Sequence, residues 1–309
     1  MHQTSWNQFV LQHGPASGRF LQSWEWGEFQ KAVGESVRRE EINEAGEVVG
    51  VAQWLDRKLP MFGTYAFCPK GPIGKNSLEG HGQQVFLRIE PEDKILIQQT
   101  QKSIDVNPAH TFISHLSAEE DVLLANMHQK TRYNIRVAKK HGVEIDLCAR
   151  DFDQVWRLFE QTSSRGQFRL HAKPYYQKMI AFFQEGACQA FLATASHGGK
   201  VIAATIMIDF GDTRTYLHGA SSNEDRNLMG PYLLHWELMR QAKEKGLSHY
   251  DWWGVAPQGA PPDHPWAGIS RFKRGFGGEE VGTLGTHDKV LKRVSYYVYQ
   301  LARSVRRSL

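Results

Sequence analysis

The sequence predicts an α/β (α+β) protein of two domains with mixed sheets, joined by a basic helix and leaving a cleft between them. The chain has 309 residues, enough for two domains that each bury a core. Both halves follow one plan, in which antiparallel strands are followed by a helix and a further strand. Two similar α/β domains commonly bind a ligand between them. We expect the first domain to span 1–144, with the C-terminal helix 285–309 packed back on it, and the second to span 145–284.

The first half begins with a short amphipathic helix over residues 20–33. Ser23 can cap this helix, apolar residues then recur at helical spacing, and Lys31 lies near its C-terminal end. Runs of strand-forming residues separated by turn residues predict strands at 36–43, 47–55, 62–67 and 85–90.

A long helical region follows. Ser117 and Glu120 have the spacing of a capping box, which predicts a helix starting at Ser117. The helix continues, with a break near His128, and stops at Gly142, which can adopt the left-handed conformation of a helix end.

Two segments of the chain are strongly basic. Arg132, Arg136 and Lys140 share one face of the predicted helix, where like charges repel unless an anion lies against them. Residues 288–309 hold six Lys and Arg residues and one acid, which favours polyanionic partners such as RNA or anionic lipid headgroups. A solvated helix face and a solubilising tail explain the same charges equally well.

The second half predicts a strand, a polar loop and a helix that together form an anion site. The other expected elements are helices at 151–161 and 174–184 and strands at 189–196, 200–210, 214–219 and 249–253. A helix opens with Pro231 and ends at Gly246. Its free N–H groups point into the loop 221–230, where Arg226 adds a full charge.

Composition excludes several classes of protein. Hydrophobic residues make up 41% and aromatic residues 11%, as in a globular protein. We find neither a signal peptide nor an apolar run long enough to span a membrane, and expect a cytoplasmic protein. Three distant cysteines allow no disulfide framework and no zinc knuckle, so we expect buried thiols, no metal and no cofactor.

The segment Arg271–Gly278 is the strongest candidate for chemistry. Familiar patterns such as GxSxG, HExxH and GxGxxG are absent. Lys273 could stabilise the oxyanion formed from an ester carbonyl, and Phe272 could shield the site. A turn with solvated charges is the plainer alternative. The loop at Arg226 compares with the pyrophosphate loop of GNAT acetyltransferases, but its spacing differs and it lacks the second Gly, which disfavours coenzyme A.

Four stretches in order resemble the FemABX family of tRNA-dependent aminoacyltransferases, which extend the peptide of peptidoglycan precursors. They are residues 130–143, 216–222, 236–254 and 271–278. The resemblance covers nearly the whole chain and implies two GNAT-like acyltransferase domains. The chain has no long polar heptad stretch of the kind that forms a coiled-coil arm, so we expect the compact form of the family without this arm.

The resemblance also implies roles for single residues. Lys273 would stabilise the transferring ester, and Phe272 would line the site. Lys31 and Arg165 would bind the phosphates of the precursor, and Tyr216 would face the same ligand. The basic residues Arg132, Arg136, Lys140 and Arg226 are the candidates for binding tRNA or another anion.

We therefore expect an aminoacyltransferase that uses aminoacyl-tRNA and a UDP-linked or lipid-linked muropeptide. A monomer is expected, with peripheral contact to membrane headgroups at the inner face as an option. Two alternatives remain open: an N-acyltransferase that uses another amine or acyl-coenzyme A, and a non-catalytic protein that binds RNA or a membrane surface. No residue is an obvious general base for the attacking ammonium.

Overall fold

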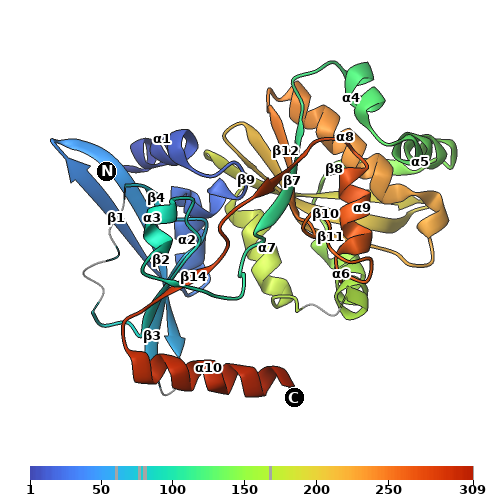
Figure 1. Cartoon of the computed structure of the whole chain (residues 1–309). Helices are drawn as coiled ribbons and strands as arrows, with labels where there is room; N and C mark the ends of the chain where they lie inside the picture. Colours follow the sequence, from blue (N-terminus) through green and yellow to red (C-terminus); the bar gives the residue numbers. More distant parts are fainter. Residues whose placement is uncertain (60–61, 76–77, 79–81, 167–168, 309) are drawn as a thin grey trace. The chain divides into compact units, whose positions relative to one another are not determined.

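The chain folds into two compact units. The computed structural model describes residues 1–308 except 60–61, 76–77, 79–81 and 167–168, with side chains to residue 304 (Figure 1). Unit 1 comprises residues 1–109 and 282–309, and unit 2 comprises residues 110–281. No helix in the described ranges is both long and apolar enough to cross a membrane.

Unit 1 is built on a seven-stranded mixed sheet with the order β1-β2-β3-β5-β14-β6, in which β4 also pairs with β2. Its strands are β1 Ser36–Glu44, β2 Glu47–Leu59, β3 Gly63–Cys68, β4 Ile73–Gly74, β5 Phe86–Ile89, β6 Gln101–Lys102 and β14 His287–Val290. Its helices are α1 Gln3–His13, the 3-10 turn η1 Arg19–Gln22, α2 Trp24–Ala32, α3 Lys94–Ile97 and α10 Arg293–Ser308.

Local sequence explains the first elements of unit 1. The expected helix at 20–33 is η1 followed by α2, and Ser23 caps α2 by accepting from the N–H of Trp26. The turn between β1 and β2 contains Ala45 and Gly46 with φ of 51° and 87°, as two-residue hairpins require.

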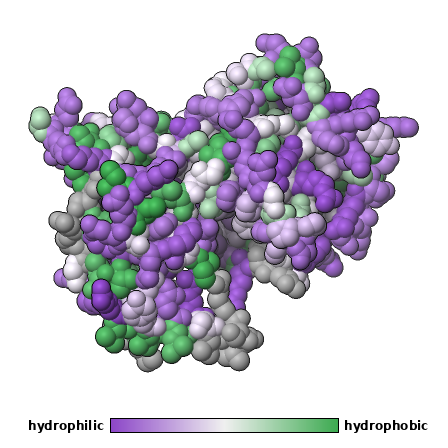
Figure 2. All heavy atoms as spheres, viewed as in Figure 1, coloured by the Kyte–Doolittle hydropathy of each residue, from purple (hydrophilic) through white to green (hydrophobic). Residues whose placement is uncertain are grey.

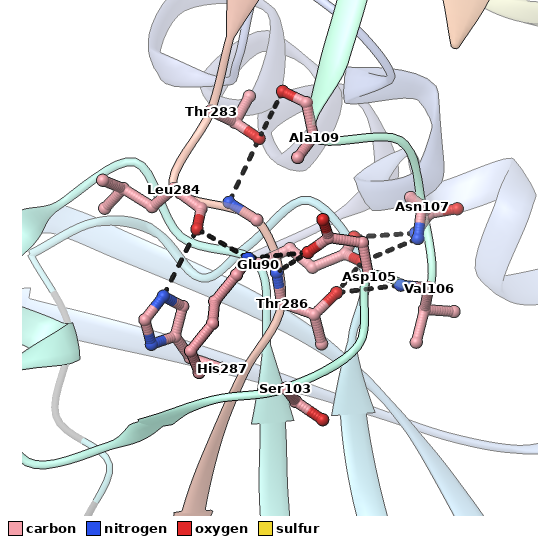
Figure 3. Close-up of polar contacts among 12 residues, drawn as sticks. Glu90, Ser103, Asp105, Val106, Asn107, Ala109, Thr283, Leu284, Thr286 and His287 are labelled. Carbon is pink, nitrogen blue, oxygen red and sulfur yellow. Dashed lines mark hydrogen bonds and ion pairs between the residues drawn. The ribbon is translucent and has the colours of Figure 1, made fainter. Parts of the chain in front are cut away.

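The last segment of the chain returns to unit 1 and completes its sheet. β14 pairs antiparallel with β5. Figure 3 shows the polar network that holds this return. The buried carboxylate of Glu90 accepts from the Thr286 hydroxyl at 2.8 Å and the Asn107 amide side chain at 2.7 Å, and Thr283 N–H donates to the Ala109 carbonyl at 2.8 Å. Residues far apart in sequence therefore share one domain.

Unit 2 contains a second seven-stranded sheet, with the order β13-β7-β12-β11-β10-β9-β8. Its strands are β7 His110–His115, β8 Glu144–Ala149, β9 Cys188–His197, β10 Lys200–Phe210, β11 Thr213–Ser221, β12 His249–Gly254 and β13 Glu279–Gly282. Its helices are α4 Glu120–Asn126, α5 Gln129–Lys140, α6 Phe152–Gly166, α7 Lys173–Phe182, the 3-10 turn η2 Arg226–Leu228, α8 Gly230–Glu244 and α9 Ala267–Arg274.

The helices of unit 2 cover both faces of its sheet. α5 and α8 bury their apolar sides in one core cluster, while α6 and α7 pack against β9, β10 and β11 on the other face (Figure 1). The expected helix after Pro231 is α8, with Leu234, Leu238 and Ala242 buried. Gly246 ends it with φ of 82°.

Three sequence-based expectations differ from the structure. The boundary between the units lies at residue 109 instead of 144, because β7 pairs with β12 and carries the following helices into unit 2. The basic helix α5 is therefore packed in unit 2 and is not a linker. The capping box at Ser117 does not form, since α4 begins at Glu120 without a side-chain cap. The break at His128 is confirmed.

Candidate active site

The candidate site lies where two parallel strands of unit 2 separate. β11 and β12 pair only from Thr213–His249 to Thr215–Asp251, although both strands continue. Tyr216 is the next residue on β11, and its ring lies 5.2 Å from the Lys273 Nζ. A Cβ at position 219 would lie 1.9 Å from the Tyr216 hydroxyl, so Gly219 makes room for this side chain.

Lys273 is a buried lysine on α9. The segment Arg271–Gly278 begins as a helix, so the alternative of a turn with solvated charges is wrong for Lys273. Its ammonium donates to the Gly254 carbonyl at 2.7 Å. Among the described residues, no carboxylate forms an ion pair with it. Two of its three N–H bonds therefore remain for a ligand.

Burial changes the protonation of this lysine. Removal from water lowers the pKa of Lys273 to about 7, although the negative charge of Asp251 acts in the opposite direction. Asp251 is fully buried on β12, and its Oδ1 accepts from the Trp253 N–H at 2.8 Å. Near neutral pH, Lys273 can thus be either charged or neutral, which a surface lysine cannot.

An irregularity in β12 presents the Gly254 carbonyl to Lys273. The register of β12 with β7 shifts between Asp251 and Gly254, and Trp253 has φ of 59°. Positive φ at a bulky residue is strained and concentrates at functional sites. The irregularity directs the carbonyl of Gly254 toward the lysine, as bulges near active sites commonly do.

Aromatic side chains enclose the lysine. Phe272 contacts Tyr232, with ring centroids 4.9 Å apart, and also contacts His235 at 5.6 Å. His235 lies 4.4 Å from the Tyr216 ring, and its Nδ1 is 2.7 Å from the Tyr250 hydroxyl. The structure thus brings Lys273, Phe272 and Tyr216 together around His235.

Burial also changes the titration of the neighbouring groups. It raises the pKa of Tyr216 to about 12. Burial, assisted by the positive charge of Lys273, lowers the pKa of His235 to about 3. Both side chains are therefore neutral at physiological pH, which leaves Lys273 as the titrating group between them.

Arg165 and Arg226 form a second cationic position in unit 2. The Arg165 guanidinium, at the end of α6, donates to the Ser221 carbonyl at 3.4 Å. Burial and the nearby charge of Arg226 on η2 lower the pKa of Arg165. Two cations that repel each other beside the loop before α8 are suited to an anion.

Lys31 belongs to unit 1. It lies in the last turn of α2, and its Nζ forms an exposed ion pair with Glu28 at 2.9 Å. Glu28 also pairs with Arg39 at 2.8 Å. Lys31 is available to a ligand because exposed pairs of this kind are weak.

The three cations of α5 have different environments. The Arg132 guanidinium donates to the carbonyls of Ala125, at 3.1 Å, and of Met127 at the end of α4. It therefore stabilises a helix terminus. Arg136 and Lys140 are exposed and form no ion pair within the described part of the chain. The exposed ring of Tyr133 shares their face of α5.

Sequence analysis did not identify His235 or Asp251. Each had a detectable signal: His235 is a polar residue on the apolar side of α8, and Asp251 is a charge inside an aromatic strand. In the described ranges, no group of three His, Cys, Asp or Glu side chains could hold a metal ion. Cys68 and Cys188 are buried as expected, but Cys148 is exposed.

Comparisons with known proteins agree on family and fold. The FemAB family model matches residues 97–197 and 188–304. A lipid II:glycine glycyltransferase of Staphylococcus aureus (strain USA300) is 21% identical over 99% of this chain and 95% of its own. A crystal structure of FemX superposes with a TM-score of 0.81 at 19% identity, covering 96% of this chain and 98% of that chain.

The fold is shared more widely than the family. A tandem GNAT protein from the clavulanic acid biosynthesis pathway superposes with a TM-score of 0.54 at 10% identity, covering 93% of this chain and 94% of that chain. The predicted α/β architecture of two GNAT-like domains with mixed sheets is confirmed.

Proposed function

The chain belongs to the FemAB family, and on that premise we propose that it is an aminoacyltransferase of peptidoglycan bridge formation. It moves an amino acid from aminoacyl-tRNA to the stem-peptide amine of a peptidoglycan precursor. The observation that carries this proposal is the buried Lys273 beside Tyr216 and Phe272, because a desolvated cation at an ester carbonyl is what acyl transfer requires.

Lys273 acts on the carbonyl oxygen during transfer. The acceptor amine attacks the ester carbon, a C–N bond forms, and the carbonyl oxygen becomes an oxyanion. One N–H of Lys273 is held by the Gly254 carbonyl, which orients the other two toward that oxygen. The acceptor ammonium loses one proton to solvent before it attacks. The ester C–O bond then breaks, and the second proton, lost from the nitrogen as the amide forms, ends on the ribose hydroxyl of the tRNA.

The precursor is bound through its phosphates and its sugar-peptide. Arg165 and Arg226 supply two cations for the phosphates in unit 2. Lys31, in unit 1, is a separate candidate for a phosphate contact. Tyr216 lies on β11 just past its last pair with β12, and its ring, 5.2 Å from the Lys273 Nζ, can orient the peptide. Phe272 excludes water from the reacting carbonyl.

The donor tRNA is bound by the exposed face of α5. Arg136 and Lys140 carry charges that no described side chain neutralises, and Tyr133, one turn before Arg136, offers a ring for stacking. Arg132 contributes by fixing the start of α5 to the end of α4. Charged residues on a helix face with one exposed aromatic ring are suited to a polyanion that also has unpaired bases.

The names of the relatives support a lipid-linked acceptor. The staphylococcal relatives are named as enzymes that transfer glycine to lipid II, a lipid-linked muropeptide. We propose that this enzyme, as a monomer, uses the same kind of acceptor at the inner face of the membrane. A UDP-linked muropeptide is the soluble form of the same acceptor.

The test is transfer from a pool of charged tRNAs to muropeptides, followed by mass analysis of the acceptor. We expect the acceptor to gain the mass of one amino acid. Lys273→Met should retain the fold and lose a factor of about 10²–10³ in rate. Lys178→Met, which removes an exposed lysine of α7, is the matched control and should transfer at the normal rate.

Two outcomes would contradict the proposal. Normal transfer by Lys273→Met would remove the lysine from the mechanism. Transfer from acetyl-coenzyme A, with none from any charged tRNA, would replace the donor and leave only the acyltransferase fold.

A further inference from the structure

Helix α10 presents a row of apolar side chains to solvent. Val294, Tyr297, Val298 and Leu301 recur at i, i+3, i+4 and i+7 and are 80%, 60%, 44% and 66% exposed. Figure 2 shows hydrophobic residues along the lower edge of the face in view, where α10 runs in Figure 1. This row, the α10 apolar row, faces away from the core of unit 1.

The opposite side of α10 holds the helix in place. Tyr296 is buried, its ring lies 5.2 Å from that of Phe86, and its hydroxyl donates to Asp288 at 2.9 Å. Tyr299 contacts the same phenylalanine at 5.4 Å. Because the anchoring residues occupy one side, the α10 apolar row cannot turn inward without losing them.

The charge around α10 determines what kind of surface suits it. Residues 289–309 contain six Lys and Arg residues and no acid. Lys292 and Arg293, at the N-terminal end of the helix, are exposed. A second copy of residues 289–309 would bring six more positive charges to the contact, and like charges repel. An anionic surface is complementary to both the charge and the apolar row.

The dimensions of α10 favour a helix lying flat. It has 16 residues, which corresponds to about 24 Å, shorter than the hydrocarbon core of a bilayer. A helix with one apolar face and flanking Lys and Arg residues lies in the plane of the interface. Tyr297 is of the residue type that accumulates at the level of the headgroups.

We propose that the α10 apolar row docks unit 1 on an anionic lipid surface, with Val294, Tyr297, Val298 and Leu301 inserted at the boundary of headgroups and acyl chains. Lys292 and Arg293 bind the lipid phosphates. This docking goes beyond the transfer reaction, because it requires neither tRNA nor muropeptide. Its failure would leave the proposed function untouched.

The test is sedimentation of the full-length protein with sucrose-loaded vesicles. We expect binding to phosphatidylcholine vesicles that contain about one-third phosphatidylglycerol, weak binding to phosphatidylcholine alone, and loss of binding in about 0.5 M salt. Val294→Glu with Leu301→Glu should reduce the partition coefficient at least about 10-fold. Both side chains are exposed, so thermal unfolding should be unchanged.

The matched control replaces two exposed apolar residues elsewhere, Ile95→Glu with Val122→Glu, and should bind vesicles as the parent chain does. Absence of binding to the anionic vesicles would overturn the proposal, as would equal binding by the α10 variant. A dimer in light scattering that dissociates in the α10 variant would replace the lipid by a second copy of the chain.

Discussion

Arg88 in unit 1 and Lys273 in unit 2 are both buried cations, but their partners differ. Arg88 forms two hydrogen bonds of 2.8 Å with the two carboxylate oxygens of Asp288, which is itself fully buried. Lys273 has a backbone carbonyl and an aromatic ring instead. Burial destabilises the charged form of both side chains. Of the two, only Arg88 has a bidentate carboxylate that compensates for this cost.

The difference separates a buried charge that has a carboxylate partner from one that has none in the described part of the chain. Burial lowers the pKa of Arg88, but the hydrogen bonds and charge of Asp288 outweigh it and raise that pKa above its ordinary value. Burial lowers the pKa of Lys273 to about 7, and no bidentate carboxylate among the described residues offsets it. A cation with a full partner holds elements together, whereas a buried cation without one is available to charge that develops in a substrate.

The largest expected effect comes from removing the partner of Arg88. Asp288→Ala leaves a buried guanidinium without compensation and should lower the free energy of unfolding by about 3–5 kcal/mol, measured by urea denaturation. Replacing both residues, as Arg88→Met with Asp288→Leu, should recover most of the loss. A loss below about 1 kcal/mol would show that the pair is no more than a surface-like salt bridge.

Lys273→Met should have the opposite effect on stability. Removing a buried charge that lacks a carboxylate partner should raise the free energy of unfolding by about 1–4 kcal/mol near neutral pH. The lysine titrates at about 7 in the folded chain and at about 10.4 in the unfolded chain. Between these values the unfolded chain binds more protons, so the stability of the parent rises with pH.

The advantage of Lys273→Met should therefore shrink as the pH rises above about 7 toward about 10.4. Urea denaturation of the parent chain and of Lys273→Met at several pH values in this range measures the difference in free energy of unfolding. A variant less stable than the parent at every pH would show that Lys273 contributes to the fold.

The smallest expected effects compare two cations of α5. Arg132→Ala removes the donor to the α4 carbonyls and should cost about 0.5–1.5 kcal/mol of stability. Arg136→Ala should leave stability unchanged and reduce the salt dependence of tRNA binding by about one phosphate contact. Thermal unfolding and filter binding at several salt concentrations separate the two. Equal losses of stability would contradict the distinction.

Local patterns in the chain predicted most elements of both sheets. Strand-forming runs bounded by turn residues depend on neighbours within a few positions, as do the cap of α2 at Ser23 and the end of α8 at Gly246. The structure confirms the cap and the helix end. The domain boundary was misplaced because it depends on β7 pairing with β12, more than a hundred residues later. The capping-box pattern at Ser117 was overridden in the same way by tertiary packing.

The sequence singled out Lys273 and Phe272 as candidates through the cations, aromatics and glycines of residues 271–278, and Tyr216 through the resemblance to a known family. Three-dimensional packing alone decided what these residues can do. Desolvation of Lys273, the nearby charge of Asp251 and the enclosure by His235 arise where separate strands and helices meet. Burial and electrostatic coupling depend on distances through space, which spacing along a chain does not contain.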